Sequence, residues 1–134
     1  MKNIELPDNM KQQSTDVNIE DLRAYLKQAE NRPAIKERLI LTMYEITENV
    51  KLLYNSEDVA VLDSEDQTGN YLCCINKSDE DINLTLSLPS LGLTKEYTAY
   101  CVLNGEDIEV SKKTFKLRIP SLNAILVKMT PVEE

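Results

Sequence analysis

The sequence YLCCINKSDEDINLTLSLP, residues 71–89, decides the fold class of this chain. In its second half apolar and polar side chains alternate, at the positions Ile82, Asn83, Leu84, Thr85, Leu86, Ser87 and Leu88. A period of two is typical of a β-strand that buries one face and exposes the other. Residues 70–77 form another strand-like run, and the segment SDED, residues 78–81, separates the two. The stretch therefore predicts two strands joined by a turn.

The same period continues on both sides of this stretch. Strands are expected in DVAVLD, NYLCCINK, INLTLSLP, EYTAYCVL, DIEV, KKTFKLRIP and NAILVKM, between residues 58 and 129. The dipeptide Asn104-Gly105 is a strong signal for a hairpin turn, and the last strand is apolar on both sides, so we expect it inside a sheet. Short strands in succession predict a mainly β protein, an antiparallel Greek-key β-sandwich, with a partly open barrel as the alternative.

Two α-helices are expected before the sandwich. Residues 1–16 are polar and aperiodic, so they predict a flexible arm; residues 17–54 predict a helical extension, and residues 55–134 the sandwich domain. The second helix, from Pro33 to about residue 54, carries an apolar stripe at Ile35, Leu39, Met43, Ile46, Val50 and Leu53. This stripe either packs against the strands or, at Ile35, Leu39, Met43, Ile46 and Val50, forms an interface for a partner. Helices that precede the strands argue against a parallel, doubly wound sheet.

Composition excludes several classes of function. The chain has 134 residues and a formal charge of −8, which argues against a nucleic-acid partner because phosphate binding needs clustered cations. No apolar run approaches the roughly 20 residues that span a bilayer. The start of the chain holds no apolar signal-peptide core, so a complete chain is expected in the cytoplasm, whereas a fragment leaves the location open.

No residue pattern indicates a reaction or a cofactor. The chain has no histidine, so a Cys-His nucleophile is excluded, and Cys73, Cys74 and Cys101 are expected to be buried, reduced thiols. Acidic side chains are expected in turns, at Asp63, Glu65, Asp66, Asp79, Glu80, Asp81, Glu106 and Asp107, where solubility explains them better than catalysis or calcium binding. The sequence thus predicts no catalytic residue, no metal and no cofactor.

Tyr97 and Tyr100 are the candidates for sugar contact. Tyrosine rings stack on pyranose rings, and this is the one close pair of aromatic residues in the predicted strands. Being three apart on a strand, the two project to opposite faces, so one is expected to be buried. The tripeptides Asn76-Lys77-Ser78 and Asn83-Leu84-Thr85 fit the N-glycosylation pattern, which without a signal peptide we interpret as chance.

Residues 70–129 resemble the small all-β domain at the C-terminal end of many glycoside hydrolases, notably the α-amylase superfamily and α-galactosidase-like enzymes. The stretches that carry the resemblance are YLCCINKSDEDINLTLSLP, LGLTKEYTAYCVLNGEDIEV and FKLRIPSLNAILVKM. In those enzymes the catalytic carboxylates lie on a preceding (β/α)₈ barrel, for which this chain has no room. The resemblance therefore implies an acidic, non-catalytic accessory domain in carbohydrate metabolism, or a fragment of such an enzyme.

Two functional hypotheses follow. In the first, the sandwich packs against a catalytic barrel domain and makes weak contact with an oligosaccharide. In the second, the protein is a free-standing cytosolic module that binds another protein through the helical stripe or a sheet edge; its acidic surface would suit a basic partner.

Overall fold

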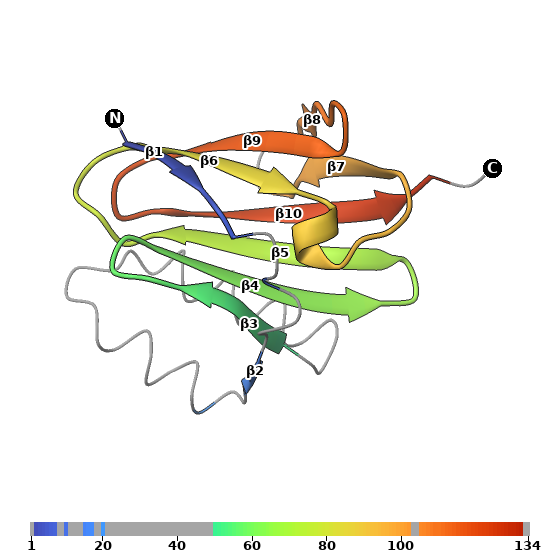
Figure 1. The fold of residues 1–134 in the computed structure, drawn as a ribbon, viewed down its shortest axis with the longest axis horizontal. Coiled ribbons are helices and arrows are strands. Elements are labelled where there is room, and N and C mark those ends of the chain that lie inside the picture. The colour runs from blue at the N-terminus through green and yellow to red at the C-terminus, as the bar shows by residue number, and fades with distance from the viewer. Residues whose placement is uncertain are drawn as a thin grey trace.

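The protein is a β-sandwich of two unequal sheets. The computed structural model describes residues 2–7, 10, 15–17, 20, 50–102 and 105–132. Its strands are β1 (Lys2–Glu5), β2 (Thr15–Val17), β3 (Val50–Asn55), β4 (Val59–Asp66), β5 (Gly69–Asn76), β6 (Ile82–Ser87), β7 (Tyr97–Cys101), β8 (Asp107–Ile108), β9 (Thr114–Ile119) and β10 (Ala124–Pro131), with a 3-10 helix η2 (Pro89–Leu91). One sheet has three strands in the order β1-β6-β9, and the other seven in the order β2-β3-β4-β5-β10-β7-β8 (Figure 1).

The chain crosses between the sheets several times. It leaves the larger sheet after β5, enters the smaller as β6, returns as β7 and β8, and crosses again to β9 and back to β10. β10 then lies between β5 and β7, antiparallel to both, which confirms its expected interior position. The alternating part of residues 71–89 forms strand β6, in which buried and half-buried residues alternate. The mainly β prediction is therefore confirmed.

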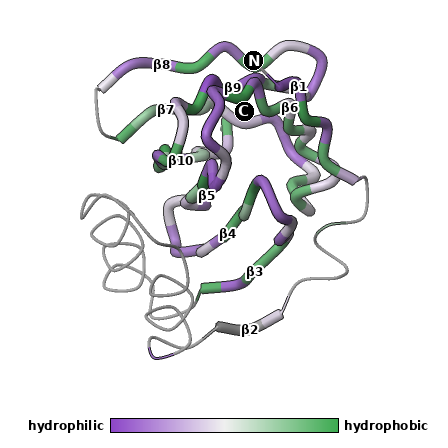
Figure 2. Tube along the Cα trace, turned by 90° about the vertical axis from the view of Figure 1, so that its left-hand side faces the viewer, coloured by the Kyte–Doolittle hydropathy of each residue, from purple (hydrophilic) through white to green (hydrophobic). Residues whose placement is uncertain are grey.

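The main core lies between the two sheets. It joins side chains of both, including Leu84 and Phe115 from the smaller sheet and Leu72 and Val127 from the larger. Hydrophobic segments accordingly recur on strands of both sheets (Figure 2). A second buried cluster occupies the other face of the larger sheet and consists of Val50, Ala60, Leu62, Cys73, Ile75, Ala124 and Leu126. The larger sheet is therefore apolar on both faces.

The predicted end of the second helix is wrong. Residues 50–55 form strand β3, which pairs antiparallel with β4. Val50 belongs to the second cluster and Leu53 to the main core, so the two project to opposite faces of β3, and both are buried because the larger sheet is apolar on both faces. Two buried residues three apart imitate the spacing of a helix, although the backbone is extended. Of the rest of the predicted helical extension, residues 17–49, only Val17, which lies in strand β2 and not in a helix, and Glu20 are described.

The predicted flexible arm is wrong for two of its segments. Lys2–Glu5 form β1, paired with β6, and Thr15–Val17 form β2, paired with β3. Met10, between them, is buried in the main core with 1% of its surface exposed. These strands of three and four residues are too short to show a period in the sequence, and their partners lie far along the chain.

The smaller sheet is not purely antiparallel. β1 runs parallel to β6, with Lys2 opposite Ile82 and Glu5 opposite Thr85. The ammonium group of Lys2 lies 3.3 Å from a carboxylate oxygen of Asp58, and its backbone N–H donates to the carbonyl oxygen of Asp81 at 3.1 Å. These contacts hold the start of β1 near the β5–β6 loop, at one end of the sandwich. The direction in which β1 runs therefore follows from tertiary contacts.

Asn76 joins the two crossings at this end of the sandwich. Its side chain is completely buried, and its Nδ2 lies 2.7, 3.0 and 3.1 Å from the carbonyl oxygens of Glu80, Ile119 and Pro120. Its Oδ1 accepts from the backbone N–H of Ser78 at 2.9 Å. The β5–β6 loop and the β9–β10 turn are therefore held by one amide group. Because this amide is buried and saturated, the Asn76 tripeptide has a structural role in the folded protein.

Among the described residues no helix has the length and apolar character needed to cross a membrane.

Replacing Asn76 with alanine should lower the free energy of unfolding by about 2 to 4 kcal/mol, because the buried carbonyl group of Ile119 and the part-buried ones of Glu80 and Pro120 lose the Asn76 donor. Urea unfolding followed by circular dichroism measures the change. The matched control is Asn83→Ala, which removes one exposed hydrogen bond, to Asn3, and should cost less than about 0.5 kcal/mol. Equal effects of the two substitutions would show that the hydrogen bonds of Asn76 do not stabilise the β5–β6 loop and the β9–β10 turn.

Gly69→Ala should destabilise the protein more than Gly105→Ala does. Both glycines have positive φ angles, +145° and +73°, which any other residue adopts with strain. A Cβ on Gly69 would also lie 2.0 Å from the carbonyl oxygen of Met129, whereas one on Gly105 meets its nearest neighbour, the Tyr100 hydroxyl, at 3.5 Å. Thermal unfolding of the two variants measures the difference, and a larger loss at Gly105 would contradict the packing argument.

Candidate functional site

The two candidate tyrosines lie on opposite faces of β7. Tyr97 points toward the space between the sheets and is half-buried, whereas Tyr100 points outward with 41% of its surface exposed. Tyr100 is paired with Lys128 on β10, and the Lys128 ammonium group lies 4.0 Å from the ring centre of Tyr71 on the same outer face. The two candidates therefore cannot form one continuous platform for a sugar, and each must be considered separately.

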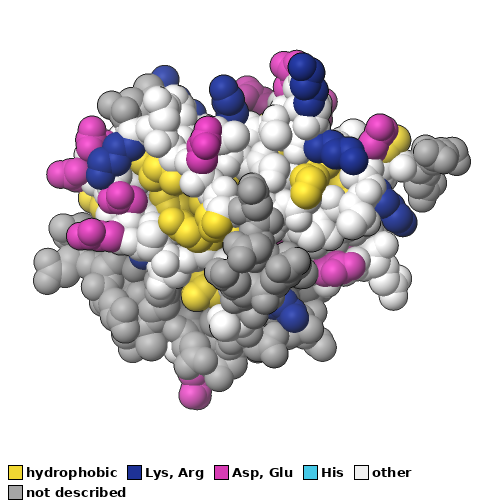
Figure 3. All heavy atoms as spheres, viewed as in Figure 1, with side chains coloured by type: hydrophobic (Ala, Val, Ile, Leu, Met, Phe, Trp, Pro, Cys, Tyr) yellow, Lys and Arg dark blue, Asp and Glu magenta, His cyan; other side chains and the backbone are white. Residues whose placement is uncertain are grey.

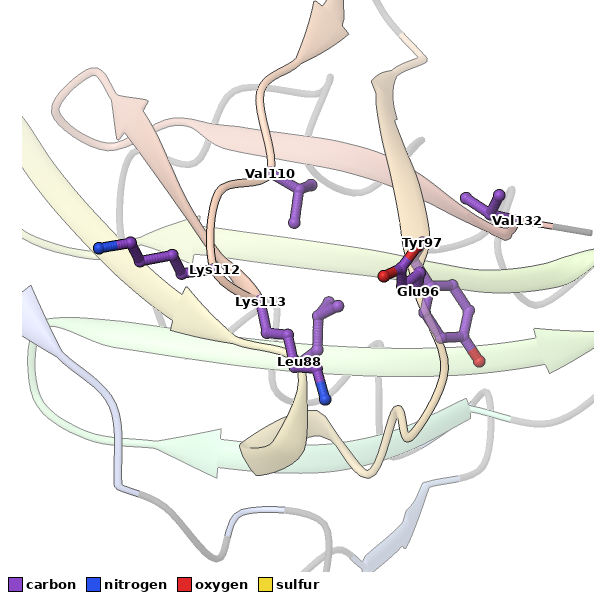
Figure 4. Close-up of a pocket in the computed structure, with 7 residues that line it drawn as sticks. All are labelled: Leu88, Glu96, Tyr97, Val110, Lys112, Lys113 and Val132. Carbon is purple, nitrogen blue, oxygen red and sulfur yellow. The ribbon is translucent and has the colours of Figure 1, made fainter. Parts of the chain in front are cut away.

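Tyr97 lines a half-open groove of about 390 Å³ at one end of the sandwich (Figure 4). The groove is built from four parts of the chain: the end of β6, the start of β7, the connection between β8 and β9, and the end of β10. Its lining residues are Leu88, Glu96, Tyr97, Val110, Lys112, Lys113 and Val132. Its volume falls within the range of small-molecule sites in proteins.

The groove combines apolar and charged groups. Leu88, Val110 and Val132 present methyl groups, while Glu96 and Lys113 approach from opposite sides (Figure 4). Burial, and then the carboxylates of Glu65 and Asp63, raise the pKa of Tyr97, so its hydroxyl stays protonated at neutral pH and is able to donate. A ring with one apolar face and a rim of hydroxyl groups matches this arrangement of an aromatic wall, an acceptor and a donor.

The two lysines of the groove are held by a tight turn. The backbone N–H groups of Ser111 and Thr114 each donate to the other residue's carbonyl oxygen, at 2.8 and 3.0 Å. Between them Lys112 and Lys113 have φ angles of 53° and 63°, the left-handed region that such turns require at both central positions. Asn-Gly is the preferred pair there, so two lysines cost about 1 kcal/mol each in backbone strain. From the sequence these lysines are expected within the strand KKTFKLRIP, and Tyr97 is the one groove residue that the sequence predicts as a site residue.

The acidic residues do not form a second site. Asp63 and Glu65, expected in a turn, lie on β4, and Asp63 is buried with an Asn70 side-chain donor at 3.1 Å. Asp66 closes the β4–β5 hairpin by accepting from the backbone N–H groups of Thr68 and Gly69 at 2.7 and 3.1 Å. Across the described residues, no group of three or more acidic or cysteine side chains is arranged to hold a metal ion.

The three cysteines are buried and free. Cys73 and Cys74 belong to different core clusters, as expected for neighbours on one strand. Burial raises the pKa of the Cys73 thiol to about 12, and that of Cys74 rises for the same reason. Both thiols are therefore protonated at neutral pH and serve as apolar side chains.

The predicted partner interface lies mostly outside the described residues. Ile35, Leu39, Met43 and Ile46 are not described, so that interface remains a prediction. Val50, its last member, is wrong as a surface residue of a helix, because it lies on β3 and is completely buried.

The fold is similar to a small part of several glycoside hydrolases. A GH27 β-L-arabinopyranosidase of Geobacillus stearothermophilus matches 63% of this chain with 20% of its own, at 25% identity and a TM-score of 0.57. An α-amylase of Geobacillus thermoleovorans matches 61% with 18% of its own, at 21% identity and a TM-score of 0.52. The α-galactosidase I of Mortierella vinacea matches 62% with 24% of its own, at 10% identity and a TM-score of 0.52.

These matches confirm the resemblance to the accessory β domain of such hydrolases. The chain spans only about a fifth of the length of the arabinopyranosidase. No family model matches the sequence, and neither does any curated protein. In these three structural matches the chain is similar to a non-catalytic β domain, and the aligned part is no more than 24% of any of the three enzymes.

The free energy of unfolding should fall as the pH drops from about 5 to 3. Hydrogen bonds from the Thr68 hydroxyl lower the pKa of Asp66, and the backbone N–H of Ser121 lowers that of Asp81. A carboxylate whose pKa is lower in the folded state contributes stability above its unfolded pKa and loses it as the pH falls through the folded pKa. Urea unfolding over this range measures the slope, and Asp66→Asn with Asp81→Asn should flatten it. An unchanged slope in the double variant would assign the effect to other carboxylates.

Proposed function

We propose that this protein is the non-catalytic accessory β-sandwich of a carbohydrate-active enzyme. Its work is to pack against a catalytic barrel domain and to contact an oligosaccharide weakly. The observation that carries the proposal is the match of this sandwich to about a fifth of a GH27 arabinopyranosidase at 25% identity. A domain without a catalytic set of residues acts in such an enzyme through binding and packing.

The sugar contact is assigned to the groove at Tyr97. One face of a pyranose ring would lie on the Tyr97 ring and the methyl groups of the exposed Val132, while Glu96 accepts from sugar hydroxyl groups. Lys113 donates from the opposite side of the groove. Tyr100 is exposed and does not line this groove, so a substitution there is a natural control for one at Tyr97.

The test is an NMR titration of the isotope-labelled protein with oligosaccharides. The panel contains malto- and galacto-oligosaccharides together with arabinose, since solved relatives hold maltose, maltotriose and arabinose. Backbone amide shifts should cluster at Glu96, Tyr97 and Val132 for at least one sugar. Tyr97→Ala should weaken this binding by about tenfold or more, as expected when a stacking ring is removed.

Tyr100→Ala provides the matched control, because it removes the same ring from the other face of β7. Its affinity for the sugar should be unchanged. Shifts that cluster at Tyr100 would move the contact to the outer face of the larger sheet. Silence across the whole panel would reject the sugar contact and leave packing against a catalytic domain as the function.

A further inference from the structure

β9 is an edge strand. It is the last strand of the three-stranded sheet and pairs only with β6, so no described strand occupies its other side. Its six residues alternate strictly between exposed and buried: Thr114, Lys116 and Arg118 face outward, and Phe115, Leu117 and Ile119 enter the core. A straight edge of this length offers backbone donors and acceptors to an additional strand.

Cations gather at this edge in an otherwise acidic protein. Lys112, Lys113, Lys116 and Arg118 fall within seven consecutive residues, and Figure 3 shows Lys and Arg side chains along the border where Figure 1 places β9. Arg118 pairs with Asp81 at 3.3 Å. The ammonium groups of the three lysines make no hydrogen bond or ion pair with any residue that the structure describes. The chain has 23 acidic side chains for 15 basic ones, so a shortage of acids does not explain this.

A second groove runs beside the edge. It measures about 350 Å³ and lies between β9 and the short β8, which is the outermost described strand of the other sheet. Phe115 and Ile108 supply its apolar lining, and Lys116 and Glu109 are its charged members. A strand added to β9 would therefore place inward side chains against an apolar surface.

Lysines on an edge strand also prevent aggregation, and this function must be compared with binding. If β9 of one molecule paired with β9 of another, Lys116 and Arg118 would approach cations of the second copy, and like charges opposite each other destabilise a sheet. The same lysines attract a strand that carries acidic side chains opposite them. Charge thus disfavours a second copy at this edge and favours an acidic partner.

We propose that β9 accepts an extended acidic segment of a partner protein as a fourth strand of the smaller sheet. Apolar residues of that segment lie beside Phe115 and Leu117, and acidic residues alternate with them beside Lys116 and Arg118. Main-chain hydrogen bonds supply affinity, while the alternation of charge and apolar side chains supplies specificity. This binding uses the β9 edge and the second groove, and it shares only the lysine turn at Lys112 and Lys113 with the groove at Tyr97.

The test uses a short synthetic peptide of alternating valine and glutamate, with a second peptide in which glutamine replaces each glutamate. Amide shifts of the labelled full chain should be confined to β9 and to Ile108 and Glu109. The glutamine peptide should bind at least about tenfold more weakly, and added salt should weaken the glutamate peptide. A glutamate peptide N-methylated along one backbone edge should not bind, since it cannot pair with β9.

Two charge reversals distinguish the effect of a cation on β9 from the effect of the protein's net charge. Lys116→Glu should reduce the affinity for the glutamate peptide by at least about tenfold. Lys95→Glu changes the net charge equally at an exposed loop position before β7 and should leave the affinity unchanged. The proposal would be overturned if both peptides bound equally well or if both charge reversals had the same effect. It would also be overturned by amide shifts away from β9 or by no binding at millimolar peptide. A concentration-dependent dimer through β9 would overturn it too.

Discussion

The structure depends on the buried amide of Asn76. The chain passes from the larger to the smaller sheet after β5 and returns before β10, and both passages meet at this side chain. Crossings leave backbone carbonyl groups of irregular loops inside the protein, where each unsatisfied group costs free energy. One asparagine with two donors and an acceptor satisfies several of them at once. The two sheets are thereby fixed at one end, and the sandwich is able to close over a single core.

The proposed sugar groove lies at the opposite end of the sandwich from Asn76. The groove at Tyr97 lies there, lined by the ends of β6 and β10, the start of β7 and the β8–β9 connection (Figure 4). The groove is formed by residues that are distant in sequence, from Leu88 to Val132, and its lysines are positioned by a strained turn. The β9 edge continues from the same turn. The two proposed binding surfaces therefore share Lys112 and Lys113, one suited to a sugar ring and one to an extended strand.

Much of the fold was predictable because strands with one buried face have a clear period. β6 and β9 alternate in sequence as they do in burial, and β10 reads as interior because it is apolar on both sides. Three features were not predictable. Burial on both faces of β3 gives Val50 and Leu53 a helix-like spacing, β1 and β2 are too short to show a period, and the parallel pairing of β1 depends on contacts with Asp58 and Asp81. Of the candidate site, the sequence predicted Tyr97 and the opposite direction of Tyr100, but none of the residues that surround Tyr97.

By itself the sequence determined the fold class, the burial of the three thiols and the lack of a histidine-based reaction, because period and composition are local properties of the chain. Only the tertiary structure decided which charged groups meet. Asp63 became a buried partner of Asn70, Asn76 became the joint between two crossings, and three lysines stayed without a described partner at an edge. The physical reason is that these properties depend on which strands become neighbours, and strand order is set by long-range pairing that no local period records.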